Sequence, residues 1–197
     1  AQVHELKAAV RWAKANAAKY RIDPERVGAM GFSAGGHLAL MLGVTGPEDG
    51  LEGNLPPSGP NTKIRAVVNY FGPTDLRTFR MKPAGEAAIR AALGVGRKGM
   101  LEQWLGTADP NSPILAKASP ITYISAGDAP VLTLQGEIGA LVLPEQAEAL
   151  HASLEKAGVI HQLVILPRAG HGFGGVDRDR TDRLTLEFLD RTLQGRK

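Results

Sequence analysis

Four short apolar runs alternate along the chain with segments in which apolar residues recur every three or four positions. The apolar runs cover residues 26–32, 64–71, 130–135 and 161–167. Runs of this length and continuity are typical of strands buried on both faces of a parallel sheet. The helical spacing extends over residues 3–20, 37–42, 144–157 and 177–193. Strands that alternate with helices predict an α/β fold in which helices cover both faces of a parallel sheet.

Two segments interrupt this alternation. Residues 43–60 contain five glycines and four prolines, a composition that favours a loop. Residues 76–120 hold only short helical patches, at 87–93 and 100–105, which glycines and prolines separate. An insertion of this kind, which we delimit at 76–115, often forms a cap over a functional site. The alternative is a plain surface insertion.

The chain has 197 residues, of which 43% are hydrophobic and 22% charged, and these values are ordinary for a soluble globular protein. This length suits one domain over residues 1–197 with a sizeable core. No stretch of about 18 apolar residues occurs, so we expect no membrane span. The chain begins Ala-Gln-Val-His, without an initiator methionine or a signal sequence, and this leaves the compartment open between cytoplasmic and secreted.

The side-chain inventory excludes several function classes. There is no cysteine, so disulfides and thiol chemistry are excluded. The net charge is +3, and the basic residues are scattered along the chain, which argues against a nucleic-acid partner. Histidines and carboxylates do not cluster with metal-ligand spacing, and no glycine-rich phosphate-binding motif occurs. We therefore expect no metal and no nucleotide cofactor.

The sequence Gly31-Phe32-Ser33-Ala34-Gly35-Gly36 joins the first predicted strand to the helix that follows it. It fits the G-x-S-x-G pattern, in which a serine is exposed on a sharp turn between a strand and a helix. The glycines let the strand and the helix approach each other closely. The Ala34 N–H then stands at the start of the helix, where it can donate to a developing oxyanion. The alternative is a glycine-rich turn that holds a serine without catalysis.

A nucleophilic serine needs a base, and His171 is the best placed of the five histidines. It lies in a glycine-flanked loop directly after the last predicted strand, and ligands of open parallel sheets gather at the carboxyl ends of strands. Ser33 also follows a strand, so we expect the two side chains to meet. We expect His37 to pack, or to bond to a neighbouring loop, one helical turn after Ser33. The remaining histidines are expected on solvated helix faces (His4 and His151) and at a strand start (His161).

Five segments, in order along the chain, resemble the α/β-hydrolase superfamily, in particular the esterase and lipase branch that includes acetylxylan- and feruloyl-esterase-like proteins. The segments are 9–27, 31–39, 70–76, 118–123 and 169–173. The resemblance extends from near residue 8 to the end of the chain. It implies that Ser33 is the nucleophile and His171 the general base, and that an ester is hydrolysed through an acyl-enzyme.

The acid of a catalytic triad is the first departure from that family. Its members usually carry a pattern like His-Gly-Asp-x-Asp-x-x-Val-Pro, whereas residues 135–144 read Gln-Gly-Glu-Ile-Gly-Ala-Leu-Val-Leu-Pro. Gly139 stands where the aspartate is expected. We choose Glu137 as the acid, because it lies at the carboxyl end of a strand and glutamate reaches farther than aspartate. The chain order also allows Asp128, Glu145 and Glu148, and a dyad without an acid would be slower but still active.

The second departure lies upstream of residue 1. In the family, several strands and a His-Gly-Gly-type loop precede the equivalent of this residue, and the loop supplies a second oxyanion donor. Without these strands, the strand before Ser33 becomes an edge with unpaired amides and carbonyls. Self-association is an economical way to cover such an edge, so we expect a homo-oligomer. A monomer in which residues 43–60 or 76–115 cover the edge is the alternative.

These observations predict a serine carboxylester hydrolase that acts on small or carbohydrate-linked acyl esters through Ser33, His171 and Glu137, with Ala34 as oxyanion donor. A serine peptidase is a related alternative, since some peptidases carry a similar serine on a sharp turn between a strand and a helix. Another is a catalytically impaired scaffold that binds a ligand or a partner, which Gly139 and the upstream departure favour. We expect Asp75 to stabilise its turn through local amide bonds rather than to bind substrate.

Overall fold

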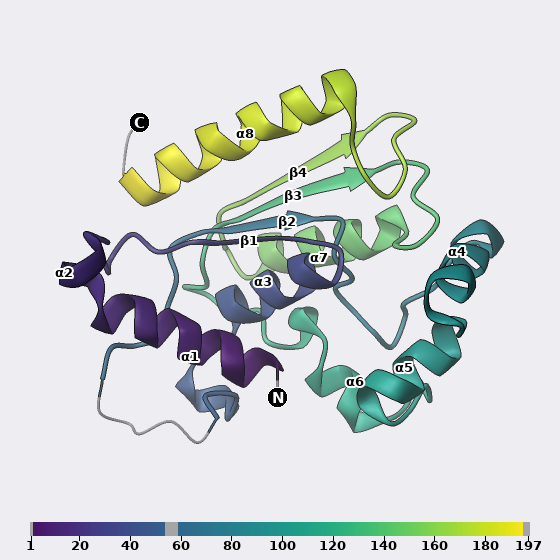
Figure 1. Cartoon of the computed structure of the whole chain (residues 1–197), viewed down its shortest axis with the longest axis horizontal. Coiled ribbons are helices and arrows are strands. Elements are labelled where there is room, and N and C mark those ends of the chain that lie inside the picture. Colours follow the sequence, from purple (N-terminus) through teal and green to yellow (C-terminus); the bar gives the residue numbers. More distant parts are fainter. Residues whose placement is uncertain (1, 54–58, 195–197) are drawn as a thin grey trace.

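A computed structural model describes residues 2–53 and 59–194 of the chain. Its centre is a sheet of four parallel strands in the order β1-β2-β3-β4 (Figure 1). The strands are β1 (Ala29–Phe32), β2 (Val67–Tyr70), β3 (Val131–Gly136) and β4 (His161–Leu166). Strands β1, β2 and β4 lie within the apolar runs of the sequence, β3 extends one residue past its run to Gly136, and the parallel α/β architecture is the predicted one. Strands β1 and β2 are shorter than predicted, because only part of each apolar run pairs.

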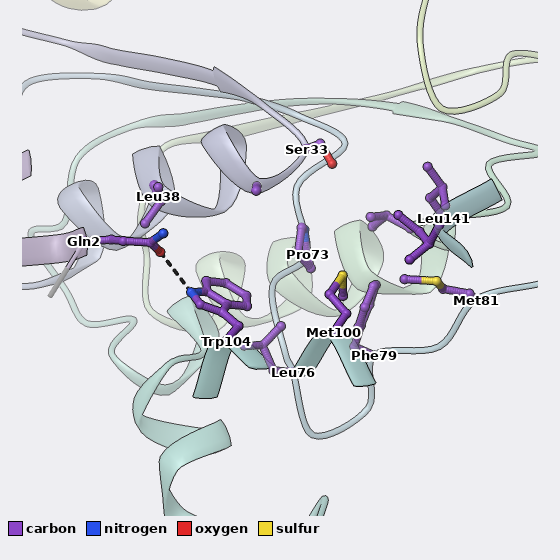
Figure 2. Close-up of a pocket in the computed structure, with 13 residues that line it drawn as sticks. Gln2, Ser33, Leu38, Pro73, Leu76, Phe79, Met81, Met100, Trp104 and Leu141 are labelled. Carbon is purple, nitrogen blue, oxygen red and sulfur yellow. Dashed lines mark hydrogen bonds between the residues drawn. The ribbon is translucent and has the colours of Figure 1, made fainter. Parts of the chain in front are cut away.

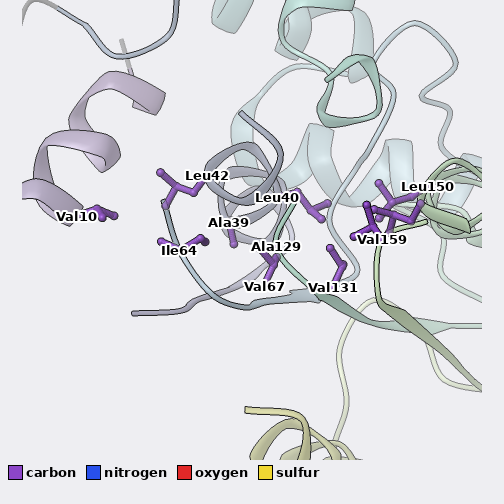
Figure 3. Close-up of a cluster of buried hydrophobic side chains, with 11 residues drawn as sticks. Val10, Ala39, Leu40, Leu42, Ile64, Val67, Ala129, Val131, Leu150 and Val159 are labelled. Carbon is purple, nitrogen blue, oxygen red and sulfur yellow. The ribbon is translucent and has the colours of Figure 1, made fainter. Parts of the chain in front are cut away.

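Helices cover both faces of the sheet, and the strands alternate their side chains between them. The helices α1 (Gln2–Ala15), α3 (Ala34–Val44) and α7 (Pro144–Lys156) lie on one face, and α8 (Gly175–Gln194) crosses the other (Figure 1). On the first face, Val67 and Val131 pack against Leu40 and Leu150, as Figure 3 shows. On the second face, Val68 and Leu132 pack against Phe188 of α8. These two apolar layers hold the carboxyl ends of the strands at one rim.

The predicted helix over 3–20 is interrupted at Asn16. The chain forms α1 up to Ala15 and a separate turn, α2 (Ala17–Tyr20), after it. The Asn16 side-chain amide donates to the Trp12 carbonyl oxygen at 2.8 Å. An asparagine that bonds to nearby backbone in this way competes with the helical pattern. The predicted single helix was therefore wrong at its carboxyl end.

Several charged side chains of α1 face inward, among them Lys7 and Arg11. Lys7 is fully buried, and its ammonium donates to the Thr45 carbonyl at 3.0 Å and to Glu52 at 2.7 Å. Arg11 donates to the second oxygen of the same carboxylate at 2.6 Å. These bonds fasten the segment after α3 to α1. Within the predicted loop over 43–60, residues 47–49 form a 3₁₀ turn, and residues 54–58 lie outside the described part of the chain.

Between β2 and β3, three helices form: the first two contain the helical patches that the sequence indicated at 87–93 and 100–105, and the third was not predicted. They are α4 (Pro83–Leu93), α5 (Arg97–Leu105) and α6 (Pro113–Lys117). Proline is the first residue of α4 and α6, a position where its missing N–H costs nothing, and Gly94 ends α4 in the left-handed conformation. This region has its own apolar cluster around Leu76, Phe79 and Leu115, against which Trp104 packs.

Strand β1 forms one edge of the sheet, as the sequence predicted. On the face that α8 crosses, its side chains Met30 and Phe32 are 53% and 54% exposed, because α8 packs mainly over β3 and leaves them partly uncovered (Figure 1). Among the described residues, no helix combines the length and apolar character that crossing a membrane requires.

Candidate active site

Ser33 occupies the sharp turn between β1 and α3. Its backbone has φ 53° and ψ −119°, a strained conformation for a residue with a side chain. The neighbouring glycines allow this turn, since a Cβ at Gly31 would collide with the Gly35 carbonyl and one at Gly36 with the Asn69 side chain. The Ser33 N–H donates to the Tyr70 carbonyl at 2.8 Å and so continues the sheet pairing past β1. The sequence pattern therefore produces a serine held at the carboxyl end of the sheet.

The turn also fixes the Ala34 amide. Ala34 is the first residue of α3, so its N–H has no acceptor within the helix. The positive end of the helix dipole lies at the same point. An oxygen that acquires negative charge beside Ser33 can accept from this donor.

His171 lies beside Ser33, although 138 positions separate them in the sequence. The distance between His171 Nε2 and Ser33 Oγ is 2.9 Å. The His171 ring rests against the ring of Phe71, with 4.6 Å between the ring centres. Burial lowers the pKa of the His171 imidazole below its ordinary value. A neutral imidazole at this distance is able to take a proton from the serine hydroxyl.

Glu137 does not hydrogen-bond to the imidazole, so the predicted bond from Glu137 to His171 is absent. Its carboxylate accepts instead from the Arg168 backbone N–H at 2.8 Å. Arg168 has φ 59°, so this bond fastens a strained point of the loop that carries His171. His171 Nδ1 is buried and has no hydrogen-bond partner within the described residues. Glu137 therefore holds the loop from its backbone, and the imidazole has no acid beside it there.

The other candidate acids lie elsewhere. Asp128 is at the opposite rim of the sheet, before β3, where its carboxylate accepts from the backbone and hydroxyl of Ser125. Glu145 and Glu148 are exposed on α7. Gly139 belongs to the turn after β3, in which its N–H donates to the Gly136 carbonyl at 3.3 Å.

Two other histidines, His37 and His151, are buried and pack within the fold. His37 is 2% exposed, and its Nδ1 lies 3.0 Å from the Pro73 carbonyl oxygen, so the expected packing and loop contact are confirmed. Burial lowers the pKa of His37 to about 4. The expectation of a solvated His151 was wrong. This ring is 7% exposed and stacks on His161 of β4, because the buried face of α7 is wider than its leucines and alanines indicated.

Gln146 of α7 is a buried positioning residue that the sequence did not single out. Its Oε1 accepts from the backbone N–H groups of Thr74 and Asp75, both at 2.8 Å. Its Nε2 donates to the Asp75 carbonyl at 3.1 Å. The Asp75 carboxylate accepts from the Arg77 N–H at 3.0 Å, as expected for a turn-stabilising aspartate. A glutamine next to the inward residues of a helix gives no signal of such a role, because its partners lie 72 positions away.

An apolar cavity of about 280 Å³ opens beside Ser33. Figure 2 shows Ser33 at its upper rim, with Leu76, Phe79 and Met100 below. Ile89 of α4 and Trp104 of α5 also line it, so the helices between β2 and β3 wall the space next to the nucleophile. The arrangement offers an acyl group an apolar pocket next to a serine, an imidazole and the Ala34 amide donor.

The chain was compared with known proteins, and it resembles esterases along most of its length. The BD-FAE family model matches residues 1–154. Esterase LipC of Mycobacterium tuberculosis is 32% identical over 182 residues, which are 90% of this chain and 42% of LipC. Esterase LipQ of the same organism is 27% identical over 88% of this chain and 39% of LipQ. The chain thus spans about two fifths of the length of these relatives.

Solved structures of esterases have the same fold. A truncated form of a carbohydrate esterase from gut microbiota aligns with a TM-score of 0.72 at 30% identity, over 95% of this chain and 68% of that one. The esterase Est2 of Thermogutta terrifontis aligns with a TM-score of 0.69 at 26% identity, over 96% of this chain and 63% of that one. The four-stranded parallel sheet and its helices therefore correspond to part of the α/β-hydrolase esterase fold.

Proposed function

The chain belongs to the BD-FAE family, and on that premise we propose that it is a serine carboxylester hydrolase in which Ser33 is the nucleophile and His171 the general base. One observation carries the proposal: the 2.9 Å distance between Ser33 Oγ and His171 Nε2. It joins the strained turn after β1 to the loop after β4, two places that the fold brings to the same rim. The relatives LipC and LipQ are both named esterases.

The reaction proceeds in two halves. His171 Nε2 takes the proton of the Ser33 hydroxyl while Oγ attacks the ester carbonyl carbon, and the Ala34 N–H donates to the resulting oxyanion. The intermediate collapses, the protonated imidazole gives its proton to the departing alcohol, and the acyl group stays on Ser33. Water, deprotonated by His171, then attacks the acyl carbonyl, and the imidazolium returns this proton to Ser33 Oγ as the acid is released.

The enzyme works as a dyad. His171 Nδ1 has no partner among the described residues, so contacts with Phe71 and the fastened loop hold the ring in place of a carboxylate. Loss of a triad acid lowers the rate without abolishing it. We therefore expect a slower enzyme than a complete triad would give.

Small or carbohydrate-linked acyl esters are the proposed substrates, with the helices over 83–105 as a cap above the acyl group. One of the solved neighbours is named a carbohydrate esterase, which supports the carbohydrate-linked class. Because His171 Nδ1 has no carboxylate partner among the described residues, a second candidate function remains. In it, the chain is a hydrolase-like scaffold that binds a ligand without turnover.

Hydrolysis of p-nitrophenyl acetate by the chain, by Ser33→Ala and by His171→Ala tests this function. Both variants are expected to lose at least about a hundredfold in kcat/KM. Equal rates in the chain and in Ser33→Ala would exclude the serine mechanism, and no hydrolysis of any ester by the chain would favour the scaffold. Cleavage of p-nitroanilide but not ester substrates would identify a peptidase.

We also propose that two copies associate across the β1 edge. The edge has no neighbouring strand among the described residues, and Met30 and Phe32 expose apolar surface beside it. Light scattering at several concentrations is expected to give a mass above that of one chain, and Met30→Lys to lower it. Leu186→Lys on α8, also an exposed apolar position, is the matched control. A single-chain mass at every concentration would contradict association.

A further inference from the structure

A second cavity adjoins the one at Ser33. It measures about 560 Å³ and is lined by residues that include His37, Met41 and Leu105. Trp104, Gln2 and Leu38 line both cavities. Figure 2 shows the Trp104 ring and the Gln2 side chain together at the end of the first cavity that lies away from Met81 and Leu141. These shared residues therefore form the partition between the two spaces.

The indole of Trp104 is fixed by two contacts from other elements. Its Nε1 donates to the Gln2 Oε1 of α1 at 2.9 Å, across 102 positions of sequence. Its ring meets the edge of the His37 ring, with 5.5 Å between the ring centres. The bond to Gln2 is exposed to solvent, and such a bond contributes little net stability. Shortening the side chain at Trp104 therefore opens the partition without leaving a buried donor unpaired.

The first cavity limits what fits beside Ser33. Its volume of about 280 Å³ equals roughly nine water volumes of ~30 Å³ each. A methylene takes up about the volume of one water, so an unbranched acyl chain that fills most but not all of this space has about six to eight carbons. The walls are almost entirely aliphatic, aromatic and thioether side chains, among them Leu76, Phe79 and Met100, so each methylene that enters gains affinity.

We propose that Trp104, held by Gln2, is the end wall of an acyl pocket and sets the upper length of the acyl chain at about six to eight carbons. Within the small acyl esters proposed above, those with chains of about six to eight carbons are then preferred, and opening the wall joins the two cavities into one that accepts longer chains. This inference rests on the proposed acyl-enzyme at Ser33, because it takes the first cavity as the acyl side of the site.

The first experiment measures kcat/KM for p-nitrophenyl esters from two to sixteen carbons. In the unaltered chain, kcat/KM is expected to rise about two- to fourfold per methylene up to six to eight carbons and to fall beyond ten. In Trp104→Ala, the ratio of the twelve-carbon to the six-carbon ester is expected to rise at least about tenfold. Trp104→Leu, a milder change, is expected to move the same ratio in the same direction.

Two control variants test whether a change in the chain-length profile comes from the Trp104 wall or from the loss of any large side chain. Trp12→Ala removes a tryptophan that is 56% exposed on α1 and lines neither cavity, so the chain-length profile should stay as it was. Met100→Ala enlarges the first cavity but leaves the partition intact, so the optimum should lengthen by about one or two carbons. A Trp104→Ala profile identical to that of the unaltered chain would overturn the inference.

A binding experiment keeps the inference independent of turnover. Octanoate and dodecanoate are titrated into Ser33→Ala and into Ser33→Ala combined with Trp104→Ala, with heat as the readout. Octanoate should bind more tightly than dodecanoate to the first protein and less tightly to the second. If this order reverses while the chain hydrolyses no ester, the pocket inference stands and the proposed function fails. The same order in both proteins would overturn the end wall, whatever the rates of hydrolysis.

Discussion

The Glu137 carboxylate accepts a hydrogen bond from the Arg168 backbone N–H, 2.8 Å away, and this contact fastens the loop that carries His171. A carboxylate in this place acts on the backbone of the loop and not on the imidazole. The bond restrains Arg168, whose φ of 59° is unfavourable for any residue other than glycine. We therefore propose that Glu137 is a positioning residue for the loop that carries His171.

Glu137→Gln tests that role. The glutamine Oε1 is still able to accept from the Arg168 N–H, so we expect kcat/KM to stay within about threefold of the unaltered chain. Glu137→Ala removes the acceptor, and we expect kcat to fall about tenfold with a smaller change in KM, because the loop loses its restraint. A large loss in Glu137→Gln with the pH profile altered would instead identify Glu137 as the acid partner of His171.

Gly139→Asp should raise activity. Gly139 stands where the resemblance to esterases places the acid of a triad, and His171 Nδ1 is without a partner in the described part of the chain. A Cβ at Gly139 would lie 2.8 Å from the Val142 backbone carbonyl oxygen, closer than real Cβ atoms come, so the backbone of this turn must move to admit the side chain. We expect kcat/KM for p-nitrophenyl acetate to rise at least about tenfold. Gly139→Asn, which has the shape without the charge, should give no gain.

The pH dependence of hydrolysis should report the neutral form of His171. Burial lowers the pKa of this imidazole below 6.5, and only the neutral ring accepts the Ser33 proton. The value of kcat/KM is therefore expected to reach its plateau above pH 6.5 and to fall as the pH drops through the lowered pKa of His171. Phe71→Ala should expose the ring and move the midpoint of kcat/KM upward toward pH 6.5. A midpoint above pH 6.5 in the unaltered chain would contradict the burial of a neutral base.

The Lys7–Glu52 pair should matter for stability. Burial by itself raises the pKa of the Glu52 carboxyl, but hydrogen bonds from Lys7, Arg11 and Thr62 together lower it to about 2. The stability that this carboxylate contributes is thus present above about pH 4.5 and is lost as the pH falls toward 2.

Glu52→Gln leaves the buried Lys7 ammonium without its charge partner, so urea unfolding should show a loss of about 3 kcal/mol. Glu102→Gln breaks a solvent-exposed pair with Lys98 and should change the free energy of unfolding by less than about 0.5 kcal/mol. Equal small losses in both variants would mean that the buried pair contributes no more than a surface one.

The sequence predicted the sheet and the meeting of Ser33 with His171, because both follow from local patterns. Apolar runs mark β1 to β4, and the carboxyl ends of parallel strands share a rim. The glycine pattern around Ser33 specifies the turn itself. Each strand and turn depends on residues that are close together in the chain, and the shared rim of a parallel sheet then brings Ser33 and His171 together across 138 positions.

Contacts between distant residues that no shared strand end explains could not be predicted in this way. Glu137 and Arg168 are 31 positions apart, and Gln2 and Trp104 are 102 apart. The spacing of residue types along the chain does not show which backbone N–H a side chain will bind. The length of the Glu137 side chain therefore could not indicate that its donor is the Arg168 N–H. The burial of His151 was likewise missed, because its partner His161 lies on a separate element.

The most direct test of the proposed mechanism is to trap the acyl group on the protein. After brief incubation with p-nitrophenyl acetate and an acid quench, peptide mass spectrometry is expected to find one acetyl group, attached to Ser33. His171→Ala should form this adduct far more slowly, and Ser33→Ala should not form it at all. Hydrolysis that proceeds without an adduct on Ser33, at the same rate in Ser33→Ala, would contradict the account.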